Sequence, residues 1–125
     1  MSIEASCGEG KYCVCGVAVS CGGDVSISLF GGTRPHVGAV SVAVYEPERD
    51  SATVSTVTVF SHRDDACTAP CAKRASAALR CTVSVSAGIH IDDAAPEELK
   101  ILMDNANRCC DALIAQLRDA SAEVL

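Results

Sequence analysis

The sequence predicts one α+β domain, in which a mostly antiparallel five-stranded sheet carries helices packed on one face. Two observations lead to this fold class. Four segments with strand-like patterns come first, and an alanine-rich helical segment, one further alternating segment and a long amphipathic helix follow, which gives the order β-β-β-β-α-β-α. The chain of 125 residues is long enough for one hydrophobic core, so residues 1–125 are expected to form a single domain.

The first four strands are predicted over residues 12–20, 25–29, 37–45 and 53–60. Residues 25–29 alternate between apolar and polar side chains, which is typical of a strand with one buried face. Residues 37–45 are apolar enough to suggest burial on both faces. Turn signals at residues 21–24 and 46–50 separate the strands. Residues 1–11 carry little pattern, and we expect them to be a loose lead-in.

An alanine-rich helix is predicted over residues 64–80, and a fifth strand over residues 82–87. Pro70 lies inside the helical segment and leaves open whether the helix begins before it or at it. Pro96 suits the first position of the last helix, and Glu97 and Glu98 suit its positive end. A stripe at helical spacing then predicts a helix packed on the sheet: Leu99, Leu102, Met103, Ala106, Cys110, Leu113 and Leu117.

Composition excludes several classes of function. The net charge is −6 and the basic residues are scattered, which argues against nucleic-acid binding. No run approaches the roughly 20 apolar residues of a membrane helix. Residues 1–4 lack the features of a signal peptide, so we expect a cytoplasmic protein. The nine cysteines are an odd number without paired CxxC spacing; they are interpreted as small core residues in a reducing compartment, with a thiolate metal or redox site as the alternative.

The three histidines of the chain each stand at a predicted end of a strand: His36, His62 and His90. If the first four strands form an antiparallel meander, the end of the second, the start of the third and the end of the fourth share one edge. The fifth strand follows a helical crossover and should run parallel to the fourth. Its end then reaches the same edge, where the three histidines would meet.

Other groups suited to an anionic, planar ligand are predicted at this edge. Both helices begin there, and helix N-termini favour anions. Gly31 and Gly32 would let the backbone approach a ligand, and Arg34 would donate to a phosphate. Phe30 and Phe60 could pack against a flat ring. Each feature also has a simpler interpretation, as a turn, a helix cap or a solvated histidine. The three histidines alternatively form a divalent-metal site with nearby carboxylates.

These residues carry a resemblance to the small prenylated-flavin chaperones, the D component of systems built around UbiD-type decarboxylases similar to gallate decarboxylase. The resemblance covers about residues 24–105 and lies in a GG-x-x-PH-x-GA stretch, an H-x-DD turn and a GIH-x-D stretch. It implies a non-catalytic protein that binds prenylated FMN and helps supply it to the decarboxylase, beside a flavin prenyltransferase. By the resemblance, the cofactor site comprises Gly31, Gly32, Arg34, Pro35, His36, Gly38, His62, Arg63, Asp64, Asp65, Gly88, His90 and Asp92.

Two alternatives remain open from the sequence. The first is a small metal-dependent enzyme, in which His36, His62 and His90 hold a metal that activates water and an aspartate accepts the proton. The second is a structural small subunit of a decarboxylase complex. We further expect a homodimer, because two-fold dimers are the commonest assembly and this core has few large side chains.

Overall fold

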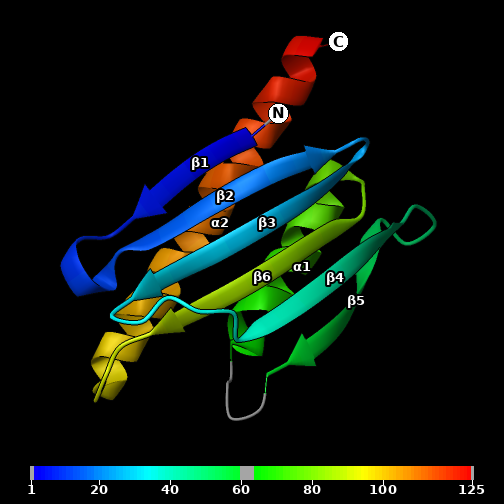
Figure 1. Cartoon of the computed structure of the whole chain (residues 1–125). Helices are drawn as coiled ribbons and strands as arrows, with labels where there is room; N and C mark the ends of the chain where they lie inside the picture. Colours follow the sequence, from blue (N-terminus) through cyan, green and yellow to red (C-terminus); the bar gives the residue numbers. More distant parts are fainter. Residues whose placement is uncertain (1, 60–63, 125) are drawn as a thin grey trace.

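The computed structural model describes residues 2–59 and 64–124 and shows a six-stranded sheet with two helices on one face (Figure 1). The α+β class and the mostly antiparallel sheet are confirmed, whereas the strand number is six and not five. The elements in chain order are β1 (Ser2–Cys7), η1 (Gly10–Tyr12), β2 (Val14–Cys21), β3 (Asp24–Gly32), β4 (Ala39–Glu46), β5 (Ser51–Thr58), α1 (Asp65–Leu79), β6 (Val83–His90) and α2 (Pro96–Val124).

The additional strand corrects the prediction of a loose lead-in over residues 1–11. β1 pairs with β2 in antiparallel register, from Ser2 opposite Val19 to Cys7 opposite Val14. Its side chains alternate between exposed and partly buried, and Ile3, Ala5 and Cys7 pack against the core. This segment forms a strand because its backbone pairs with β2 and its apolar side chains cover part of α2.

The strand order β1-β2-β3-β6-β4-β5 corrects the predicted meander. β6 lies between β3 and β4, parallel to β3 and antiparallel to β4. The predicted directions nevertheless hold, because β4 is antiparallel to β5, which makes β5 and β6 parallel. The crossover through α1 passes over β4 and does not end beside β5.

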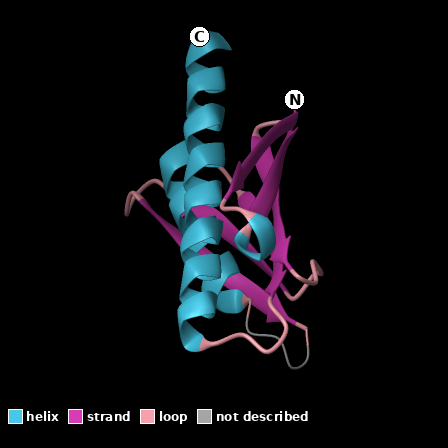
Figure 2. Ribbon diagram, turned by 90° about the vertical axis from the view of Figure 1, so that its left-hand side faces the viewer, coloured by secondary structure: helices cyan, strands magenta, loops and turns pink. Residues whose placement is uncertain are grey.

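Both helices cover the same face of the sheet, as Figure 2 shows from the side. α1 contacts β4, β5 and β6, while α2 contacts β1, β2 and β3, and the two helices contact each other. Ile27, Leu29, Val85, Leu102 and Leu113 are fully buried between these layers. The opposite face, which we call the open face, carries no element of the described chain.

α1 begins at Asp65 and contains Pro70, which answers the question that the sequence left open. Proline removes one backbone donor from a helix. The first turns are held in place by buried Cys67, Thr68 and Cys71. α2 follows the predicted stripe, except that Leu99 is exposed. Within the described residues, no helix is long and apolar enough to cross a membrane, and the cytoplasmic location stays a prediction.

Candidate functional site

The structure brings His36 and His90 together at one edge of the sheet, although they are far apart in sequence. Their ring centroids are 6.4 Å apart, and the rings meet edge to face. His36 lies in the connection between β3 and β4, and His90 ends β6. The directions of β3, β4 and β6 place these positions at the same edge. His62 and Arg63, together with Phe60, lie outside the described residues, so their predicted places in the site are untested.

His36 is held between two oxygen atoms. Its Nε2 lies 3.1 Å from Oδ2 of Asp64, and its Nδ1 lies 3.0 Å from the backbone oxygen of Arg34. Both separations are within hydrogen-bond distance, so each ring nitrogen has an oxygen partner. Asp64 is almost fully buried, and its Oδ1 accepts a hydrogen bond from the backbone N–H of Ile89 at 3.1 Å. This carboxylate therefore ties the start of α1 to both the histidine loop and β6.

A second group of charges surrounds Asp92, just after β6. Arg34 donates to both carboxylate oxygens of Asp92, at 2.8 Å to Oδ1 and 3.3 Å to Oδ2. His90 Nε2 lies 3.0 Å from Oδ1. The hydrogen bonds of Arg34 and then of His90 lower the pKa of Asp92. The group is exposed, so we expect it to contribute little to stability and to be accessible to a ligand.

Four glycines of the predicted site allow the chain to pack against itself. A Cβ atom on Gly88 would collide with the backbone of His36, and one on Gly38 would collide with the carboxylate of Asp64. Cβ atoms on Gly31 and Gly32 would meet the backbone oxygens of Cys13 and His90. Gly32 also has a φ of +86°, a conformation that favours glycine. These positions require glycine because of the fold, whereas the sequence suggested close approach to a ligand.

The expectation that both helix N-termini bind an anion is not met at α2. Oε1 of Glu98 accepts the backbone N–H of Ala95 at 3.1 Å, and Glu98 also bonds Lys11 and Tyr12. The hydrogen bond from Lys11, and then that from Ala95, lowers the pKa of Glu98 to about 2. This carboxylate already satisfies a helix N-terminal donor, as in a capping box. Sequence reasoning assigned Glu98 only a favourable dipole position and missed its link to η1.

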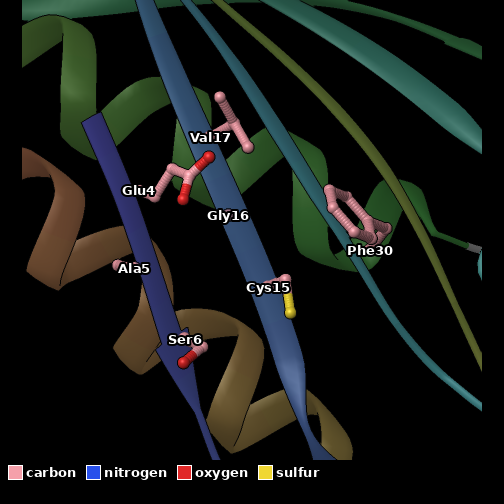
Figure 3. Close-up of a pocket in the computed structure, with 7 residues that line it drawn as sticks. All are labelled: Glu4, Ala5, Ser6, Cys15, Gly16, Val17 and Phe30. Carbon is pink, nitrogen blue, oxygen red and sulfur yellow. The ribbon is translucent and has the colours of Figure 1, made fainter. Parts of the chain in front are cut away.

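A hollow of about 420 Å³ lies on the open face over β1, β2 and β3 (Figure 3). Its lining comprises Glu4, Ala5, Ser6, Cys15, Gly16, Val17 and Phe30. Phe30 pairs with Gly88 of β6 in the parallel ladder, and the backbone of His36 lies over Gly88. We call the end of the sheet that carries His36 and His90 the histidine edge. Phe30 thus connects this histidine edge with the hollow. The sequence singled out Phe30 but gave no sign of the other lining residues, because β1 was not predicted.

The cysteines mostly support the interpretation as core residues. Cys67, Cys71, Cys109 and Cys110 are fully buried, and all nine are free thiols. Burial raises the pKa of Cys109 to about 12. Hydrogen bonds with Cys110 and Cys67, and the nearby Arg74, lower the pKa of Cys71.

Among the residues that the structure describes, no three His, Cys, Asp or Glu side chains are arranged to hold a metal. The three-histidine metal site includes His62 and stays a prediction.

An exposed arginine, two histidines and a hollow lined by an aromatic ring thus lie near the same end of the sheet. The family model for the "Prenylated flavin chaperone LpdD-like domain" matches residues 8–118. The chain therefore belongs to this family, which confirms the resemblance seen in the sequence motifs. Because the family is one of chaperones, its membership agrees with an accessory protein that is not itself an enzyme.

Comparison with solved structures confirms the fold. A chain in the crystal structure of a novel chaperone complex for yeast 20S proteasome assembly has a TM-score of 0.62, with 12% sequence identity. The match covers 93% of this chain and 95% of that chain. At this identity the likeness concerns the fold alone. No protein in the curated set matched the chain.

Proposed function

We propose that this chain binds prenylated FMN at the histidine edge, as a homodimer, and supplies it to a UbiD-type aromatic-acid decarboxylase after a flavin prenyltransferase has made it. The observation that carries the proposal is the meeting of Arg34, His36 and His90 at one edge of the sheet. Membership of the prenylated flavin chaperone family supports the identity of the ligand.

The residues present fit such a cofactor. The guanidinium of Arg34 contacts Asp92 through Nε and one terminal nitrogen, so its other N–H groups can donate to a phosphate. The imidazole rings of His36 and His90 lie at the same end of the sheet and add further hydrogen-bonding groups. A flat, largely apolar ring system suits the hollow beside Phe30, whose volume lies within the usual range for small-molecule sites. In this proposal the phosphate lies at the charged edge and the ring lies over β1–β3.

The test uses protein co-expressed with a flavin prenyltransferase and purified without oxygen. We expect wild-type protein to release prenylated FMN, identified by its absorbance and mass, and the Arg34→Ala variant to release several-fold less. Arg49→Ala is the matched control, because Arg49 is 77% exposed against 72% for Arg34, and also pairs with one carboxylate. Arg49 lies in the turn between β4 and β5, away from the site.

Four results would contradict the proposal or redirect it. A folded wild type free of flavin, even after reconstitution, would refute flavin binding. Equal flavin content in the Arg34→Ala and Arg49→Ala variants would move the site away from this edge. Substrate turnover that a chelator abolishes would favour the metal-dependent enzyme, and flavin-independent co-purification with the decarboxylase would favour a structural subunit.

A further inference from the structure

The open face of the sheet has an unusual composition for a surface in contact with water. The sequence suggested that residues 37–45 are buried on both faces, but helices cover only one. Val42, Val44 and Val57 are 40%, 50% and 75% exposed on the other. Sheet faces that stay in water normally alternate apolar residues with polar or charged ones. Exposed valines on neighbouring strands therefore indicate a surface that a partner covers.

Two rows of side chains cross the centre of this face. Aligned by the strand register, they read Val17, Ser28, Ser86, Val40 and Val57, and Val19, Ser26, Ser84, Val42 and Ser55. Neither row contains a charged residue. The acidic side chains of the open face lie at its margin, in the edge strand β1 (Glu4) and at strand ends (Asp24 and Glu46). The centre of the face therefore carries small, uncharged side chains.

We propose that a second copy of this chain covers the open face, sheet against sheet. Both rows read Val-Ser-Ser-Val across β2, β3, β6 and β4, which is the same in either direction. A two-fold axis between the sheets, along or across the strands, then places valine over valine and serine over serine. Such self-complementarity is what an isologous contact requires.

Charge and area also favour a second copy. Two chains of net charge −6 repel each other wherever their acids meet, and the centre of this face holds none. Six strands of about eight residues present roughly 700 Å² on one face, close to the ~800 Å² that each partner contributes to a standard interface. Small side chains allow two sheets to pack about 10 Å apart. The second copy would also cover the hollow beside Phe30.

This inference rests on one part of the proposed function, the homodimer, and does not depend on flavin binding. Its test therefore uses flavin-free protein. Sedimentation velocity over a wide concentration range measures the mass of wild type, Val42→Lys and Ile101→Lys. Ile101 is the matched control because it is 42% exposed against 40% for Val42, but lies on α2. We expect the wild type and Ile101→Lys to be dimers and Val42→Lys to be a folded monomer by circular dichroism.

A second variant covers the case in which Val42→Lys does not fold. Ser28→Arg places a long charged side chain at an exposed position in the centre of the face, and we expect it to be monomeric as well. A monomeric wild type would overturn the inference, and so would a folded Ser28→Arg that remains dimeric. If Ser28→Arg instead weakens binding of a monomer to the decarboxylase, that protein covers the face and the second copy does not. A monomer that binds flavin would refute the second copy and leave flavin binding in place, and a dimer that binds none would refute flavin binding and leave the second copy in place.

Discussion

At the scale of single residues, the glycines of the site show how closely the loops pack. Gly88 has room for no side chain because the backbone of His36 crosses directly over it. We therefore expect Gly88→Ala to lower the free energy of unfolding by about 1–3 kcal/mol, as overpacking does. Gly23→Ala is the control, since nothing lies within 4 Å of the added Cβ. Urea titration measures both, and equal losses would contradict the described approach of His36.

A buried thiol gives a prediction for alkaline pH. The raised pKa of Cys109, about 12 against an ordinary 9.0, means that the unfolded chain loses this proton first. The stability that the protein gains because Cys109 stays protonated is complete below about pH 9 and is lost as pH rises toward 12. We expect the stability of Cys109→Ala to fall less steeply with pH over this window than that of wild type. Parallel curves from urea titrations at several pH values would show that Cys109 titrates normally.

At the scale of elements, the local patterns predicted five of the six strands and both helices, with their chain directions. β1 was missed although Ile3, Ala5 and Cys7 alternate with Ser2, Glu4 and Ser6, which is a signal for a strand. The place of β6 between β3 and β4 could not be predicted, because neighbour order depends on which strands fit together after the crossover. The predicted position of the candidate site at one end of the sheet is unaffected by this error, because it depends on strand direction and not on strand order.

The start of α2 gives a prediction at this scale. Glu98 joins the helix N-terminus to η1 through Ala95, Lys11 and Tyr12. The pKa of Glu98 is lowered to about 2. Its ionised carboxylate therefore contributes to stability above pH 4.5, the ordinary pKa of a glutamate, and this contribution is lost as pH falls toward 2. We expect Glu98→Gln to be less stable than wild type at neutral pH and the difference to shrink in acid. Glu97→Gln serves as the control, and thermal unfolding measured from neutral to acid pH tests the trend.

At the scale of the whole molecule, the two faces of the sheet differ: the helices cover one face, and no element of the described chain covers the other. The helices bury the large side chains on one face, so the hydrophobic core is complete without the open face. The histidine edge and the hollow beside Phe30 both border that open face. The cofactor and the second copy that we propose would therefore meet on the same side of the molecule.

The identity of the ligand could not be derived from composition, spacing or fold. The residues indicate an anionic, planar molecule, and only the family adds the prenylated flavin. The meeting of these side chains was predicted in outline, because His36, Arg34, His90, Asp64 and Asp92 do converge, while their role in binding stays a prediction. The hollow was not predicted, since its walls include the strand that the sequence analysis missed.

The most direct test of the central claim is to follow the histidine ring signals by NMR while prenylated FMN is added without oxygen. We expect the signals of His36 and His90, assigned with His36→Gln and His90→Gln variants, to shift in proportion to the flavin bound. Bound flavin that leaves both signals unchanged would contradict binding beside His36 and His90 and place the cofactor elsewhere on the protein.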